Sequence, residues 1–181
     1  MGNLKASVSM ITFNHEKFIA QAIESIMSQQ TSFEFELVIG DDGSTDNTRV
    51  ICEQYQKQFG NKIRLIFNDK NIGSVNNFLQ NIYSCDGDFI AICDGDDFWT
   101  DNSKLQKQVS FLDSHSDFSF CFTNVRSVDS NGKQIKPFTQ IYYNDTFTHE
   151  SYVAKITPPT VTTLFRKNML PKVFPDEFKV L

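Results

Sequence analysis

The sequence predicts a three-layer α/β/α fold in which a mainly parallel sheet lies between helices. Short apolar segments of strand length alternate with segments whose apolar residues recur at helical spacing. The chain has 181 residues, of which 40% are hydrophobic and 22% charged, as in a globular protein with a single core. Strands that alternate with helices pair in parallel through crossover connections, so we expect helices on both faces of the sheet.

The elements follow each other regularly as far as Asn124. Residues 17–29 and 50–59 carry apolar side chains every three or four positions, which predicts amphipathic helices. Ser44, Thr45 or Asp46 can cap the second of these helices. The predicted helices include residues 17–29, 50–59, 75–82 and 105–112. The predicted strands cover residues 6–12, 35–39, 63–67, 89–93, 118–122 and 160–165.

The alternation breaks after Asn124. The run from Asp129 to Gly132 is a hairpin signal. Residues 125–148 are aromatic and β-branched without helical spacing, so we predict a small β-rich excursion from the sheet.

Composition excludes several classes of function. Lys and Arg number 17 against 22 Asp and Glu, for a net charge of −5, and there is no basic tract, so nucleic acid is not expected as a partner. No apolar run approaches the ~20 residues of a transmembrane helix. The four cysteines and three histidines are scattered without metal-ligand spacing, which favours a reduced, cytoplasmic chain over zinc or disulfide frameworks.

The strand of residues 89–93 ends abruptly in Asp94-Gly95-Asp96-Asp97. Side chains two positions apart in an extended segment point the same way, which directs Asp94 and Asp96 to one point. Hard oxygen ligands in this arrangement suit Mg²⁺ or Mn²⁺. The alternative is an acidic surface turn, because Asp and Gly favour turns.

Two other strand ends carry polar side chains. Thr12 and Asn14 follow the first strand, and Asp41 and Asp42 follow the second. Ligands of open α/β sheets bind at the carboxyl ends of the strands, so these groups can converge with the acidic run. Asp42 could accept a hydrogen bond from a ribose hydroxyl or a base N–H, although a solvated turn remains the alternative.

No glycine-rich phosphate loop follows the first strand, and there is no Gly-x-Ser-x-Gly elbow. The sequence therefore disfavours P-loop enzymes, dinucleotide dehydrogenases and α/β-hydrolases.

Four ordered motifs resemble those of the inverting, family 2 nucleotide-sugar glycosyltransferases, which have the GT-A fold. These are Val8–Asn14, Leu37–Asp46, the run Asn71-Ile72-Gly73 with Asn76-Asn77-Phe78, and Asp94–Asp97 with Trp99. Two departures stand out: Ile11 replaces the usual proline, and the arginine that many members carry in the third motif is missing.

The resemblance implies a role for each matched residue. Asp42 and Thr12 would bind the base, with Phe13 and Asn14 beside them, while Asn71 and Gly73 would shape the loop near the diphosphate. Asp94 would contact ribose or the metal shell, Asp96 would ligate Mg²⁺ or Mn²⁺, and Asp97 would face the sugar or acceptor. Trp99 would either wall the sugar pocket or pack in the core.

The resemblance also implies the whole reaction. The donor would be a UDP-sugar, with dTDP as an alternative, and the acceptor a glycan or lipid-linked glycan at the inner face of the membrane. We expect residues 1–181 to form one domain, with residues 1–124 as its donor half and 125–181 as the start of an acceptor half. We expect the catalytic base after Leu181, because the late carboxylates Asp176 and Glu177 are placed like the loop before it. A nucleotide-sugar-binding fragment without catalysis and a metal-dependent nucleotidyltransferase remain alternatives.

Overall fold

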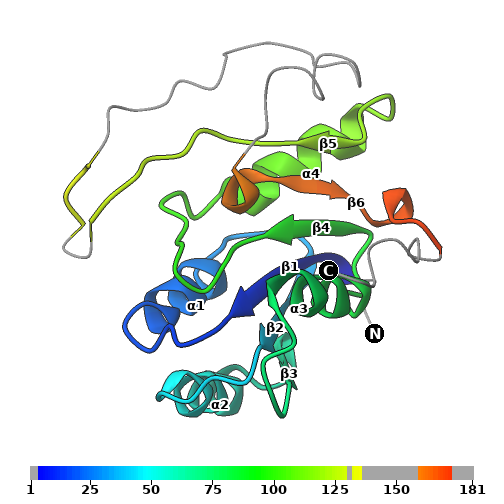
Figure 1. Cartoon of the computed structure of the whole chain (residues 1–181). Coiled ribbons are helices and arrows are strands. Elements are labelled where there is room, and N and C mark those ends of the chain that lie inside the picture. Colours follow the sequence, from blue (N-terminus) through cyan, green and yellow to red (C-terminus); the bar gives the residue numbers. More distant parts are fainter. Residues whose placement is uncertain (1–3, 130–131, 136–158, 173–181) are drawn as a thin grey trace.

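The computed structural model describes residues 4–129, 132–135 and 159–172. Within these ranges a six-stranded sheet has the order β3-β2-β1-β4-β6-β5, and Figure 1 shows the strands side by side. Strands β1 to β4 pair in parallel, whereas β6 is antiparallel to both β4 and β5. The predicted α/β class with a mainly parallel sheet is confirmed. The strands are β1 (Leu4–Thr12), β2 (Glu34–Asp41), β3 (Ile63–Phe67), β4 (Phe89–Ile92), β5 (Phe120–Cys121) and β6 (Leu164–Arg166).

All four predicted helices are present. They are α1 (Ile19–Met27), α2 (Thr48–Phe59), α3 (Ser74–Tyr83) and α4 (Lys104–Ser114). The described residues also form three short 3₁₀ helices: η1 (Gly60–Lys62), η2 (Thr160–Thr162) and η3 (Lys167–Met169). None of the helices in the described ranges is long and apolar enough to cross a membrane.

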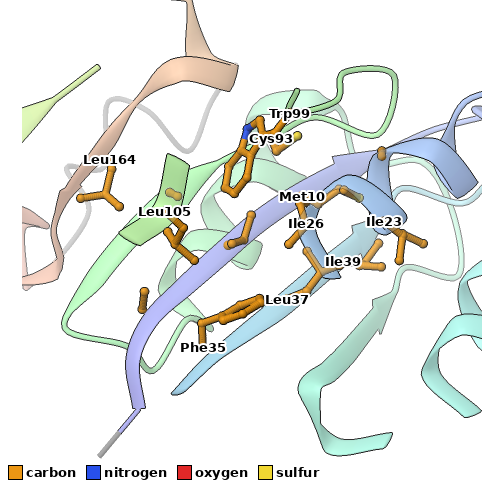
Figure 2. Packing of buried hydrophobic residues seen from close by; sticks show 14 of the residues in the cluster. Met10, Ile23, Ile26, Phe35, Leu37, Ile39, Cys93, Trp99, Leu105 and Leu164 are labelled. Atoms are coloured by element: carbon orange, nitrogen blue, oxygen red, sulfur yellow. The ribbon is translucent and has the colours of Figure 1, made fainter. Parts of the chain in front are cut away.

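The core lies on both faces of the sheet. On one face, β1 and β2 pack against α1 and α4 in one cluster of buried side chains that includes Met10, Leu37, Ile23 and Leu105, all labelled in Figure 2. Each such side chain contributes about 1.5–3 kcal/mol on burial. On the other face, α3 packs Ile82 against β2 and β4. The helical spacing seen in the sequence therefore marks the faces that hold the sheet.

Strand register brings the polar strand ends together. Thr12 lies opposite Asp41 in the pair of β1 and β2. Beyond β4 the chain continues beside β1, because the backbone N–H of Gly95 donates to the carbonyl of Ile11 at 2.9 Å. The acidic run after β4 is thereby held next to Thr12.

The later elements differ from the sequence prediction. Residues 160–162, predicted as strand, form η2, because the backbone N–H of Thr162 turns back to the carbonyl of Pro159. The strand that follows, β6, begins only at Leu164, and β5 keeps two of the five residues predicted for 118–122. Of the predicted excursion over 125–148, the described part includes an antiparallel bridge of Val128 with Gln134, and residues 130–131 and 136–148 lie outside the described residues.

Candidate functional site

A pocket of about 320 Å³ opens at the carboxyl ends of β1, β2 and β4. It lies where the sheet order places these three strands side by side, as expected for ligand sites of open α/β sheets. The lining residues in the described part of the chain are Ile11, Thr12, Phe13, His15, Asp42, Asn71, Ser74, Asn77, Asp94 and Asp96.

The end of β1 contributes one wall. The hydroxyl oxygen of Thr12 is buried and has no hydrogen-bond partner in the described residues, although Thr12 lines the pocket. Phe13 is 41% exposed and lines the pocket as well. Asn14, at a φ of 55°, does not line it: its side chain accepts the backbone N–H of Thr45 at 2.9 Å and so ties the β1 end to the loop after β2.

The end of β2 contributes two buried carboxylates. Asp41 is fully buried, and its Oδ1 lies 2.5 Å from Nε of Arg49. Asp42 is 2% exposed and lines the pocket. The alternative of a solvated acidic turn is therefore wrong for both residues, since an exposed turn would leave their oxygens to water.

Asp42 also holds the loop that faces it. Its Oδ1 accepts the backbone N–H of Ile72 at 2.8 Å, and its Oδ2 accepts that of Gly73 at 3.0 Å. Charge-assisted bonds of this kind are stronger than neutral ones. Gly43, with a φ of +77°, allows the close approach, because a Cβ there would lie 2.7 Å from the backbone nitrogen of Asn71. Asn71 and Gly73 are thus fixed beside Asp42, and Asn71 lines the pocket.

The acidic run after β4 lies next to the end of β1, on the side away from β2. Asp94 and Asp96 line the pocket, whereas Asp97 is not among the lining residues. Burial raises the pKa of Asp94 above its usual range, and the neighbouring Asp96 raises it further. Burial, together with Asp96 and Asp94, raises the pKa of Asp97 to about 6. No Lys or Arg in the described part of the chain is recorded in an ion pair with these three crowded carboxyl groups, so a cation would relieve their charge.

One contact reaches the acidic run from η2, which precedes β6, the strand next to β4. The hydroxyl of Thr160, in η2, donates to Oδ2 of Asp94 at 3.2 Å. Nearby, Trp99 is 5% exposed, and its indole N–H donates to the carbonyl of Val161 at 3.0 Å. Trp99 is therefore a packed core residue, which decides between the two roles that the sequence left open.

Comparison with known proteins identifies the family. The sequence profile described as Glycosyl transferase family 2 matches residues 7–174, which is nearly the whole chain. The chain belongs to glycosyl transferase family 2.

Relatives and solved structures agree with this assignment. Rv1520 of Mycobacterium tuberculosis is 32% identical over 161 residues, which are 89% of this chain and 46% of that protein. The protein alr2836 of Nostoc, described as an uncharacterized glycosyltransferase, is 32% identical over 180 residues, which are 95% of this chain and 54% of that protein. The crystal structure of residues 1–349 of Staphylococcus aureus TarS in complex with UDP-GlcNAc aligns with a TM-score of 0.71 and 26% identity, covering 91% of this chain and 46% of the TarS chain. The chain thus spans about half the length of these relatives, and its sheet has the GT-A architecture.

The site of this family 2 chain contains most of the residues predicted from sequence. Six of the predicted residues line the pocket: Thr12, Phe13, Asp42, Asn71, Asp94 and Asp96. Gly73 lies just outside the lining as the residue before α3, and Asn14 and Asp97 are not among the lining residues.

Sequence reasoning missed four lining residues: Ile11, His15, Ser74 and Asn77. His15, one of the three histidines whose scattered positions gave no sign of a site, is the important omission. Its position three residues after Thr12 was the available signal, because a loop that leaves a strand end next to a pocket tends to contribute to it.

Proposed function

We propose that the protein of which this chain is part transfers a sugar from a UDP-sugar to a glycan or lipid-linked acceptor, with inversion at the anomeric carbon. The observation that carries the proposal is the pocket that has Asp42 at the end of β2, Asp94 and Asp96 after β4, and Thr12 between them at the end of β1. A nucleotide-sugar has a matching distribution of charge, because its base is neutral and its diphosphate, which lies beyond the ribose and carries the sugar, is negatively charged. Membership of family 2 and the UDP-GlcNAc complex of TarS support a nucleotide-sugar as the donor.

Asp42 is proposed to receive the base. Its Oδ1 accepts the backbone N–H of Ile72 and, at 3.4 Å, a side-chain N–H of Asn68. Its Oδ2 accepts the N–H of Gly73 and, within the described residues, keeps a second lone pair. A buried carboxylate with a spare acceptor site can recognise the N3–H of uracil. Thr12 supplies a second polar group, since its buried hydroxyl has no partner within the described residues.

Asp94 and Asp96 fit a divalent cation, Mg²⁺ or Mn²⁺. Both carboxylates line the same wall, and burial and mutual repulsion disfavour the ionised form of Asp94 in the absence of a positive charge. No group of three His, Cys, Asp or Glu suited to holding a metal occurs in the ranges that the structure describes. Magnesium sites of nucleotide enzymes commonly use one or two carboxylates and take their other ligands from phosphate and water. Such a cation would supply charge neutralisation for the departing diphosphate.

Inversion also requires a base that takes the proton of the acceptor hydroxyl. We propose that this base lies on the acceptor side of the protein rather than among Asp42, Asp94 and Asp96, which line the pocket assigned here to the donor. Asp97 is proposed to lie nearer the acceptor, because it follows the donor wall without lining the pocket.

Calorimetry with UDP, with and without Mn²⁺, tests the donor half of the proposal. We expect the chain to bind UDP with Mn²⁺ present, and we expect Asp96→Ala to abolish the effect of the metal. The matched control is Asp88→Ala, which removes an exposed carboxylate that precedes β4. Binding of dTDP with equal affinity would contradict the choice of uracil, and preference for UTP over UDP would favour a nucleotidyltransferase.

Turnover requires a separate measurement. The longer protein, supplied with UDP-sugars and a glycan acceptor, should release UDP and form a product of inverted anomeric configuration. UDP binding without turnover by the longer protein would indicate a binding module instead.

A further inference from the structure

We propose that the imidazole of His15 contacts the diphosphate of the donor through its Nε2–H. This inference deepens the proposed function and rests on it. It assigns to the pocket a residue that none of the matched motifs explains, and it names the part of the ligand that the residue recognises.

The described lining of the pocket has few groups that can neutralise a phosphate or donate a hydrogen bond to it. Its described lining includes three carboxylates, Asp42, Asp94 and Asp96, and neither Lys nor Arg. The arginine expected from the third motif is missing as well. His15 is the one described lining residue with a basic side chain, so it is the group best suited to donate a hydrogen bond to a phosphoryl oxygen.

The position of His15 is fixed by its own backbone. Its carbonyl accepts the backbone N–H groups of Phe18 and Ile19, each at 2.9 Å, just where α1 begins. The residue is therefore anchored to a regular element rather than carried on a free loop, and its ring is held against the acidic run after β4.

The two ring nitrogens have different surroundings. Nδ1 is buried without a hydrogen-bond partner in the described residues, and it faces Gly95, where a Cβ would lie only 3.0 Å away. Nε2 lies 4.0 Å from Oδ2 of Asp96, a residue that lines the pocket. A proton on Nε2 faces an acceptor, whereas a proton on Nδ1 faces none, so the tautomer with Nε2–H is favoured.

A separation of 4.0 Å is too long for a direct hydrogen bond between the imidazole and the carboxylate. The Nε2–H can consequently donate a hydrogen bond to a ligand atom at this edge of the pocket. A diphosphate held beside Asp94 and Asp96 comes within reach of it, while the base, at the Asp42 side, does not. The geometry thus predicts that His15 recognises the diphosphate and not the nucleoside.

Three variants of the chain test the assignment. His15→Ala removes both ring nitrogens, His15→Gln places an amide N–H near the position of Nε2, and His15→Asn places one near that of Nδ1. With Mn²⁺ saturating, we expect His15→Ala to weaken UDP binding roughly tenfold, the usual effect of a lost hydrogen bond to a charged group. His15→Gln should recover most of the affinity and His15→Asn should not. The affinity for uridine, measured by ligand-observed NMR, should be the same in all four proteins.

Several outcomes would overturn it. Equal rescue by His15→Asn would assign the contact to Nδ1, and a parallel loss of uridine binding would make His15 a base-binding or purely structural residue. A UDP defect that disappears as Mn²⁺ is raised would mean that His15 acts on Asp96 rather than on the phosphates. If the unsubstituted chain fails to bind UDP, the proposed function itself fails; if it binds UDP and His15→Ala binds equally well, only the role of His15 is refuted.

Discussion

Oδ2 of Asp42 lies 3.0 Å from the backbone nitrogen of Gly73, and this contact joins the end of β2 to the beginning of α3. Oδ1 of the same carboxylate accepts the neighbouring N–H of Ile72. One side chain therefore both lines the pocket and holds the loop that closes one side of it.

Asp42→Asn should loosen that loop. The amide offers one acceptor oxygen and turns an NH₂ group toward a backbone N–H, so one of the two bonds is lost and a donor faces a donor. We expect faster hydrogen exchange at the amide of Ile72 or Gly73 and at least a roughly tenfold loss of UDP affinity. Asp69→Asn, a change at an exposed carboxylate in the same loop, is the control. Unchanged exchange at both amides would contradict the structural role.

Arg49→Ala should destabilise the fold strongly. Asp41 is fully buried, and the guanidinium of Arg49 is its charged partner at 2.5 Å. Loss of one partner of a buried pair costs about 3–5 kcal/mol, because the remaining charge is left without compensation. Lys107→Ala breaks the exposed pair with Asp101 and should cost no more than about 1 kcal/mol. Urea denaturation of both variants measures the difference, and equal losses would refute the argument.

Asp97→Asn should stabilise the metal-free chain at neutral pH. The pKa of Asp97 is raised by burial to about 6 in the folded state, against 3.8 in the unfolded state. At a pH between these two pKa values, the carboxyl group of Asp97 is ionised in the unfolded state but still protonated in the folded state. The free energy of unfolding therefore falls as the pH rises from about 4 to about 6. Asparagine removes this loss, and we expect a higher Tm for the variant at pH 7 and little difference below pH 4. The experiment is thermal unfolding in EDTA, and a lower Tm for Asp97→Asn at pH 7 would contradict it.

Gly95→Ala should disturb the pocket. A Cβ at this position would lie 2.7 Å from the hydroxyl oxygen of Thr12 and 3.0 Å from Nδ1 of His15. Both neighbours are buried against it, so one must move, at a cost of roughly 1–3 kcal/mol. We expect weaker UDP binding together with NMR shift changes centred on Thr12 and His15. Shift changes confined to residues 94–97 would mean that the acidic run moves instead.

The sequence was sufficient for the framework of the fold. Helices α1 to α4 and strands β1 to β4 have apolar spacing that matches their packing, and the polar strand ends met as expected, because parallel strands end at one edge. Local patterns determine these features, so they could be predicted without knowledge of distant contacts.

Long-range contacts determine what could not be predicted. The aromatic side chain of Trp99 after an acidic run fits a pocket wall as well as a core, and only the bond from its indole to Val161 decides. The β-branched run Thr160–Thr162 suggests a strand, but its backbone turns back to the carbonyl of Pro159. The place of His15 in the site depends on its proximity to Asp96, which is some eighty positions later in the sequence. The spacing of residues along the chain does not reveal such a contact.

The place of β6 has a consequence for the solubility of the chain. Every described residue that lines the pocket lies between Ile11 and Asp96, whereas the outer edge of β4 is covered by β6, Leu164–Arg166. A shorter piece that ended before Leu164 would keep all the pocket residues and leave the wholly apolar strand Phe89–Ile92 with an unpaired edge. Bare strand edges of this kind pair with other chains and aggregate. A piece that carries the pocket thus depends for its solubility on β6, a segment that contributes no residue to the described lining of the pocket.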